Sequence, residues 1–373
     1  MKNLVLKILF LSLFLLKIDF AVFAEHLTGG EMRYSYINTL PDGRQTYEIS
    51  VQIYRDALGG GANFDDPLYI TIYNLDNNTF RNKSIRLFTS NISVLPLNNL
   101  GPCAKKIPQI KIEKAIYIFK DTVGLNTNGY MFAHQRCCRP SSISNLFAPG
   151  DQGSTYSVLL TRAAMLATNS NPVFIQDPPI LMCIRSNFEY QFASTDANGN
   201  KLRYYLCEPF VGGNNYSNDG IRPTTMSRPP YTSVQYATGH SATKPFGPTV
   251  DVVLDPNTGL ISFSPDRLGI FTVAVCVEEF NPSNQSIGIY KRDIQFNVAD
   301  CIVASASASI DAAEPVEGVF ASCKGQTIKF KNKSLDAQTY LWDFGVDGIQ
   351  SDTSNIKEPV YSYPDSGTYK VCY

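Results

Sequence analysis

The chain has 373 residues, of which 44% are hydrophobic and 17% charged, and its formal net charge is −1. A charge this close to zero provides no electrostatic attraction to nucleic acid or to an anionic membrane, so we expect neither as a partner. The length allows about two to four domains, and the 21 Tyr and 22 Phe residues, against one Trp, are typical of a β-rich protein.

The N-terminus has the pattern of a secretory signal peptide. Two lysines precede the apolar run from Ile8 to Leu16, and the small residues within 21–24 offer a cleavage site. A membrane anchor is the alternative, but Lys17 and Asp19 interrupt the hydrophobic stretch. We therefore expect residues 1–24 to be a signal peptide, the mature protein to be exported, and no segment to span a membrane.

Nine cysteines in an exported chain favour disulfides over metal thiolates. A zinc site needs ligands at C-x-x-C or H-x-x-x-H spacing, and neither spacing occurs. The odd number leaves at least one cysteine unpaired, or paired with something outside this sequence.

The first predicted module covers residues 25–170. Apolar residues alternate with polar ones from Tyr47 to Ile53, after a turn at 41–43, and again from Leu68 to Ile72. This period of two predicts β-strands. Further strands are predicted at 112–119, 130–135 and 155–161, with a loop at 141–150.

The second predicted module covers residues 171–301. Its strands are expected at 188–192, 202–206, 250–254, 260–263, 271–277 and 290–298, with a polar turn at 196–200. A Pro- and Gly-rich insertion, residues 208–247, separates the first two of these strands from the rest. Helical periodicity is nearly absent throughout, which predicts all-β modules in series.

The third predicted module covers residues 302–373 and contains the single tryptophan, Trp342. An alternating strand at 328–334 precedes it, and Asp365-Ser366-Gly367-Thr368-Tyr369 follows as a turn before a strand. These features predict an immunoglobulin-like β-sandwich. Because the final strand stops at Tyr373 with no partner after it, we expect this module to be incomplete and the sequence to be the front part of a longer polypeptide.

The third module resembles the PKD domain through Tyr340-Leu341-Trp342-Asp343-Phe344-Gly345, Pro359-Val360-Tyr361-Ser362-Tyr363 and Gly367-Thr368-Tyr369. The first two modules resemble the N-terminal region of large secreted, PKD-containing proteins of Bacteroidota, which often end in a gliding-motility-associated, type IX secretion sorting domain. The second module is also similar to cadherin-like and immunoglobulin-like repeats. The resemblance to the Bacteroidota proteins depends on His26-Leu27-Thr28-Gly29-Gly30-Glu31, Tyr54-Arg55-Asp56, Gln135-Arg136-Cys137-Cys138-Arg139, Thr195-Asp196-Ala197, Asp255-Pro256-Asn257-Thr258-Gly259-Leu260 and Val275-Cys276-Val277-Glu278-Glu279, in that order. The cadherin-like resemblance depends on the D-x-x-T-G-x-I hairpin that begins at Asp255. The resemblance implies architecture and a secreted or cell-surface location, and it names no ligand.

The expected disulfides follow from the strand positions within such sandwiches. We predict Cys207–Cys276 between neighbouring strands, and Cys183–Cys301 because the first and last strands run parallel in cadherin-like repeats. In the third module Cys323 would pair with Cys372. Cys103 is expected to pair with Cys137 or Cys138, and the remaining vicinal cysteine would be a buried thiol, a redox-active site or part of a vicinal disulfide.

Two kinds of site remain as hypotheses. Asp196, Asn198 and Asn200 offer oxygen ligands at alternate positions of one turn, which suits calcium, although a polar turn bonded to its own backbone explains them too. Residues 212–249 mix aromatic with small polar residues, as adaptable recognition loops do, and the alternative is an unspecific surface excursion. The aromatic candidates for binding there are Tyr216, Tyr231, Tyr236 and Phe246.

No catalytic residues or cofactor are predicted. Glu278 and Glu279 are adjacent on a predicted strand, so they point to opposite faces and cannot act as a pair. The expected function is therefore adhesion, binding of an extracellular protein or carbohydrate, or surface display. The alternative is that these modules are accessory domains of a larger secreted protease or glycosidase whose catalytic domain follows residue 373.

Overall fold

The fold is that of a computed structural model, which describes residues 27–58, 63–96, 104–106, 109–213, 222–303, 308–310, 325–334, 339–349 and 351–373. The signal-peptide prediction and the cysteines at 103 and 323 lie outside these ranges. Within them, no helix is long and apolar enough to cross a bilayer. The architecture is almost entirely β, as the sequence predicts.

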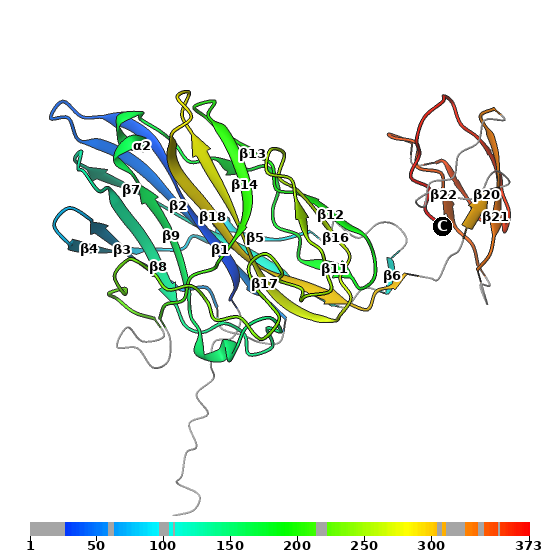
Figure 1. The fold of residues 1–373 in the computed structure, drawn as a ribbon, viewed down its shortest axis with the longest axis horizontal. Coiled ribbons are helices and arrows are strands. Elements are labelled where there is room, and N and C mark those ends of the chain that lie inside the picture. The colour runs from blue at the N-terminus through cyan, green and yellow to red at the C-terminus, as the bar shows by residue number, and fades with distance from the viewer. Residues whose placement is uncertain are drawn as a thin grey trace, which may run out of the picture.

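One long sheet runs through both of the first two modules (Figure 1). Its strand order is β14-β17-β18-β1-β2-β7-β5, and β11 pairs with β18 in parallel. The strands are β1 (Leu27–Thr39), β2 (Gln45–Asp56), β5 (Ile92–Val94), β7 (Ile112–Val123), β11 (Leu181–Cys183), β14 (Lys201–Cys207), β17 (Gly269–Phe280) and β18 (Ser286–Ala299).

Two smaller sheets pack against this long sheet. The first has the order β4-β3-β8-β9 and the second the order β12-β16-β15. Their strands are β3 (Leu68–Asn74), β4 (Thr79–Ile85), β8 (Tyr130–Arg136), β9 (Ser154–Leu160), β12 (Phe188–Gln191), β15 (Val253–Leu254) and β16 (Leu260–Phe263).

The two smaller sheets cover opposite faces of the long sheet. Gly30 of β1 lies opposite both Ile53 of β2 and Asp293 of β18, so those two side chains share one face. Ile53 belongs to the core of the first module, whereas Ile294, the residue after Asp293, belongs to the core of the second. Successive residues of a strand point to opposite faces, so the two cores lie on opposite sides of the same sheet.

The junction between the modules is therefore a strand pair. β1 hydrogen-bonds to β2 on one side and to β18 on the other. The sequence predicts separate sandwiches that meet near residue 170. In the structure one sheet continues across both modules, and the second core also contains Tyr54, Leu95 and Ile112 of the first module.

A glycine pair makes this junction possible. Gly29 has a φ of +155°, and a β-carbon on it would clash with the backbone carbonyl of Asp293. A β-carbon on Gly30 would lie 2.8 Å from the carbonyl oxygen of Gln52. The backbones of β1, β2 and β18 approach closely only because both positions lack a side chain.

The remaining elements are short. α2 (Arg162–Leu166) is capped by Thr161, whose Oγ1 accepts a hydrogen bond of 3.0 Å from the Ala164 N–H. The others are β6 (Ala104–Lys106) paired with β19 (Ile302–Val303), β10 (Val173–Phe174) paired with β13 (Ser194–Thr195), and the 3-10 turns η1 (Thr89–Asn91) and η2 (Pro149–Asp151).

The third module has its own aromatic core. Trp342 is fully buried against Phe330, with 5.3 Å between the ring centroids, and its Nε1 donates to the Ile356 carbonyl at 2.9 Å. The described strands are β20 (Ala308–Ile310), β21 (Thr327–Asn332) and β24 (Val360–Ser362) in one sheet, and β22 (Trp342–Asp343) with β23 (Thr353–Ser354) in another.

Candidate functional site

Two disulfides pin the second module. Cys183 at the end of β11 is joined to Cys301 beyond β18, with 5.2 Å between the Cα atoms. Cys207 of β14 is joined to Cys276 of β17, with 5.9 Å between the Cα atoms. Both pairings are those expected from the sequence, and such bonds suit an oxidising environment.

The third disulfide corrects a prediction. Cys137 and Cys138 are joined to each other after the end of β8, which is the vicinal disulfide that the sequence left open as an alternative. Neither is therefore left to pair with Cys103, which lies outside the described residues. Neither cysteine is left as a buried thiol. Cys323, the expected partner of Cys372, lies outside the described ranges, so that pairing stays a prediction.

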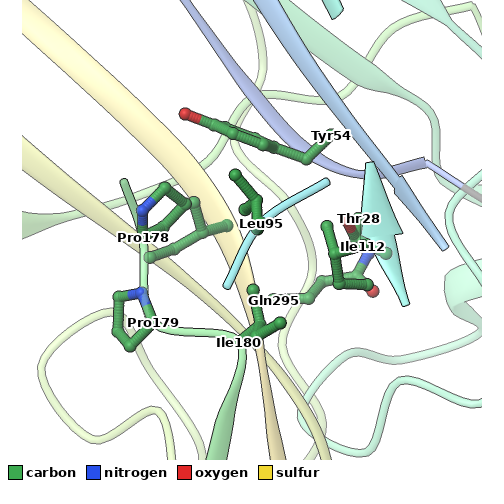
Figure 2. Close-up of a pocket in the computed structure, with 9 residues that line it drawn as sticks. Thr28, Tyr54, Leu95, Ile112, Pro178, Pro179, Ile180 and Gln295 are labelled. Carbon is green, nitrogen blue, oxygen red and sulfur yellow. The ribbon is translucent and has the colours of Figure 1, made fainter. Parts of the chain in front are cut away.

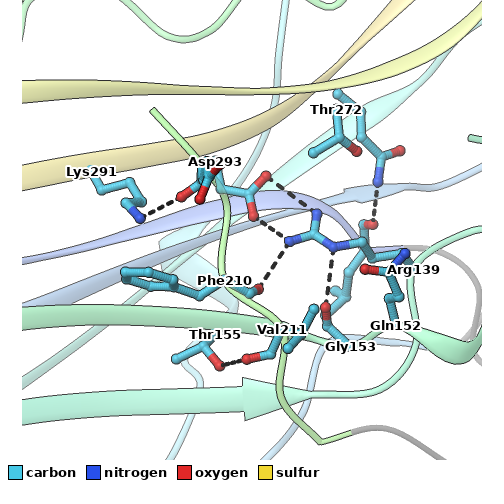
Figure 3. Close-up of polar contacts among 12 residues, drawn as sticks. Arg139, Gln152, Gly153, Thr155, Phe210, Val211, Thr272, Lys291 and Asp293 are labelled. Carbon is cyan, nitrogen blue, oxygen red and sulfur yellow. Dashed lines mark hydrogen bonds and ion pairs between the residues drawn. The ribbon is translucent and has the colours of Figure 1, made fainter. Parts of the chain in front are cut away.

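A buried ion pair lies on the face of β18 opposite the second core (Figure 3). The Arg139 guanidinium donates to both carboxylate oxygens of Asp293, at 3.3 and 2.6 Å, and to the carbonyls of Gly153 and Phe210. The side chains of Arg139 and Asp293 are 1% and 3% exposed. Because two segments supply the carbonyls, Arg139 ties the 139–153 loop and the insertion to the long sheet.

Other polar contacts extend this attachment. The Asn145 side chain accepts a hydrogen bond from the Thr272 N–H at 2.9 Å and donates one to the Thr272 carbonyl at 2.8 Å. This amide therefore pairs with the backbone of β17 as a neighbouring strand would. Thr155 of β9 donates to the Val211 carbonyl, and the Thr155 N–H donates to Phe210 at 3.2 Å. The insertion thus covers the free edge of β9, which would otherwise present unpaired backbone groups.

Lys291 is a partly buried amine in the same region. It donates to the Glu208 carbonyl at 2.6 Å, and its Nζ lies 3.2 Å from the centroid of the Phe210 ring. Burial lowers the pKa of Lys291 to about 8, against the opposing charges of Asp293 and Glu208. Because the amine already has these partners within the protein, we assign Lys291 a structural role.

The insertion also lies across the outer face of the β4-β3-β8-β9 sheet. The Met226 N–H donates to Thr71 Oγ1 at 3.3 Å, the Ser227 N–H donates to Gln135 Oε1 at 2.7 Å, and the Tyr73 hydroxyl donates to the Met226 carbonyl. Met226 itself is buried. A segment of the second module is therefore anchored on the first.

The predicted binding aromatics divide into three cases. Phe246 is fully buried and stacks on Phe263 at 4.3 Å between centroids, so it is a core residue and its prediction as a binding residue is wrong. Tyr231 and Tyr236 are half-buried in the packed insertion. Tyr216 lies outside the described residues.

The calcium candidates do not converge on one point. Asp196 Oδ1 accepts from the backbone N–H groups of Asn198 and Asn200, at 3.0 and 2.7 Å, which is the polar-turn alternative. Asn198 Oδ1 accepts from the Ser170 N–H at 3.0 Å. The amide nitrogen of Asn200 donates to Glu279 Oε1. Among the described residues, no group of three or more His, Cys, Asp or Glu side chains could hold a metal ion.

Glu279 of β17 is a buried carboxyl that the sequence analysis considered only as a catalytic partner of Glu278. It receives hydrogen bonds of 2.8 Å from the side-chain amides of Asn169 and Asn200. Burial raises its pKa to about 7 against those two hydrogen bonds, and the charge of Asp196 acts in the same direction as burial. Glu278, its neighbour, points to the other face and is half-exposed, as the alternation predicts.

A second buried ion pair lies on the opposite face of β18. Arg292 donates to both carboxylate oxygens of Glu31, at 2.6 and 2.8 Å, and its guanidinium lies 3.9 Å from the centroid of Phe174. This pair joins β18 to β1 across the junction of the modules. Burial alone would raise the pKa of Glu31, but the positive charge of Arg292, followed by hydrogen bonds from Arg292 and from two tyrosine hydroxyls, holds that pKa below its usual value.

A small pocket lies where β1, β2 and β18 meet the 178–180 segment (Figure 2). It is lined mainly by apolar side chains, with Thr28 and Gln295 as polar groups, and has room for about one water molecule. Gln295 Nε2 already donates to the Leu27 carbonyl at 3.1 Å. The pocket is too small for an organic ligand.

Fold and contacts together define a disulfide-containing, all-β protein of immunoglobulin-like construction. Comparison with protein-family models finds no match, and comparison with curated proteins finds none either.

Proposed function

We propose that this protein is exported and that its first two modules form one stiff unit for adhesion or display at the cell surface. The partner would be an extracellular protein or a carbohydrate. The unit does not act as a catalyst in this proposal.

The observation that carries the proposal is the junction between the modules. Ion pairs buried on both faces of β18, Glu31–Arg292 and Arg139–Asp293, join segments from both modules. An interface of this kind resists the hinge motion that is the default between domains. A stiff, disulfide-pinned unit suits holding a binding surface away from a cell, where reducing systems do not reach.

The alternative is that the modules accompany a catalytic domain further along the polypeptide. A secreted hydrolase of that kind would use the same rigid unit as a spacer. The two proposals differ in what is lost from cells when the gene is removed.

The test uses the source organism with the gene deleted and restored. We expect protease added to intact cells to cleave the protein, and deletion to lower attachment of cells to protein- or glycan-coated surfaces several-fold. Loss of secreted protease or glycosidase activity with unchanged attachment would favour the alternative. Recovery of the chain from the cytoplasm with its cysteines reduced would contradict both.

A further inference from the structure

Two carboxyl groups meet where the first module passes into the second. Asn200 links them, because its backbone N–H donates to Asp196 Oδ1 at 2.7 Å while its side-chain amide donates to Glu279 Oε1 at 2.8 Å. Asn169, from the linker between the modules, donates to the other oxygen of Glu279. The turn, the linker and β17 therefore converge on Glu279.

One oxygen of this cluster lacks a donor. Asp196 Oδ2 is buried and receives no hydrogen bond from the described residues. Two ionised carboxylates only accept hydrogen bonds, so Glu279 can supply the missing donor only when it carries a proton. Leaving a buried acceptor unsatisfied beside a second negative charge is unfavourable.

The surroundings favour a neutral Glu279. Leu202 of β14 and Gly288 of β18 lie opposite it in the sheet, and neither carries a charge. From β1, the Tyr34 hydroxyl approaches, since a β-carbon built on Gly288 would lie 3.5 Å from it and 3.9 Å from Glu279 Oε2. The titratable groups that face Glu279 are thus Asp196 and Tyr34, and neither brings a positive charge.

We propose that Glu279 carries a proton that it donates to Asp196 Oδ2, and that this hydrogen bond fastens the 196–200 turn to the linker between the modules. Loss of the proton places two negative charges together and releases the turn. The junction is then tight in mildly acidic surroundings and looser in alkaline ones. This goes beyond adhesion or display, because it makes the stiffness of the unit depend on pH.

The sign follows from the pKa of Glu279, about 7 in the folded protein against a reference value of 4.5. A carboxyl whose pKa rises on folding contributes its stability fully below the reference value and loses it as the pH rises through the folded value. Protection should therefore begin to fall above about pH 4.5 and level off once the pH passes about 7, so a comparison of pH 6 with pH 8 records the last part of the fall.

The experiment is hydrogen exchange followed by mass spectrometry on the complete secreted chain, in EDTA, at pH 6 and pH 8. Protection factors are corrected for the intrinsic pH dependence of exchange. We expect protection of residues 194–200 and 169–171 to be about tenfold lower at pH 8 than at pH 6, because the folded carboxyl passes from about one-tenth to about nine-tenths ionised while the released carboxyl is ionised at both pH values. Peptides from β2 serve as an internal reference that should not change.

Three variants sharpen the test. Glu279→Gln keeps the hydrogen-bonding shape without a titratable proton, so its protection should be the same at both pH values. Asp196→Asn removes the second negative charge, so ionisation of Glu279 no longer places two charges together, and the loss of protection at pH 8 should be smaller than in the wild type. Glu278→Gln, on the opposite face of the same strand, should behave as the wild type does.

Two results would overturn the proposal. One is equal protection of the wild type at both pH values. The other is a midpoint below pH 5 for Glu279 when its side-chain carboxyl is titrated by NMR, which needs no variant.

Discussion

At the scale of single residues, the most consequential feature is that Arg292 and Asp293 are neighbours and both are buried. On a strand they point to opposite faces, so a strand with one solvent-exposed face would leave one of them in water. Here each face of β18 is covered, and each charge has a partner of opposite sign. The pair of residues marks the strand on which the two cores meet.

Removing one member of a buried ion pair should cost far more than removing both. Arg139→Met leaves Asp293 buried without a counter-charge, and we expect a loss of about 3–5 kcal/mol in the free energy of unfolding. Arg139→Met combined with Asp293→Leu should lose clearly less, because no uncompensated charge remains. Urea unfolding of the secreted chain measures both, and equal losses in the two variants would show that the pair contributes little.

Phe246 offers a direct comparison between packing and recognition. Because its ring is enclosed by three other phenylalanines, Phe246→Ala should open a cavity and cost about 3–5 kcal/mol. Tyr231→Ala, at a half-buried position of the same insertion, should cost less. Thermal unfolding measures both losses of stability. A smaller loss for Phe246→Ala than for Tyr231→Ala would contradict the assignment of Phe246 to the core.

At the scale of elements, strand alternation carried most of the predictive information. Tyr47, Ile49, Val51 and Ile53 alternate in the sequence and all face the first core in β2. Period two reports which residues share a face, but it does not say which strand lies alongside. The pairing of β1 with β18, more than 250 residues apart, therefore could not be predicted from local pattern.

The candidate sites were harder to predict than the strands. Composition made the insertion look like a recognition loop, because exposed and buried aromatic residues are indistinguishable without knowing what they contact. Tertiary packing placed Phe246 in the core and Met226 over the first module. Glu279 was missed for the same reason, since its importance comes from Asn169 and Asp196, which are distant in sequence.

The two disulfides of the second module should each contribute substantially to its stability. They close segments with sequence separations of 69 and 118 residues, and restricting loops of that length in the unfolded chain is worth about 4–5 kcal/mol in the chain-entropy model. We expect Cys207→Ser with Cys276→Ser, and separately Cys183→Ser with Cys301→Ser, to lower the free energy of unfolding by about 3–5 kcal/mol. Urea unfolding under oxidising conditions measures this, and the same treatment with reductant should bring the wild type to or below the variants. A loss below about 1 kcal/mol would mean that strand pairing alone holds these positions.

At the scale of the whole molecule, the first two modules are not independent tandem domains. Each has a core of its own, yet the sheet between them is continuous and the insertion of the second module lies on the first. Cooperativity should follow the buried contacts rather than the boundary near residue 170. The boundaries of the cooperative folding units therefore need not coincide with the module boundary in the sequence.

This leads to a test of the first module by itself. A protein of residues 25–170 would expose the edge of β1 that pairs with β18 at residues 29–31. It would also leave Glu31 without Arg292 and Arg139 without Asp293. An unpaired strand edge is a template for association with other chains, and here it would lie beside two buried charges without partners. We expect this protein to aggregate, and residues 25–303 to be monomeric and to unfold in one transition, as judged by size-exclusion chromatography and calorimetry. If residues 25–170 instead give a monomer with cooperative unfolding, the strand pair at the junction is an interface between independent domains, and the stiffness on which the display proposal depends would be lost.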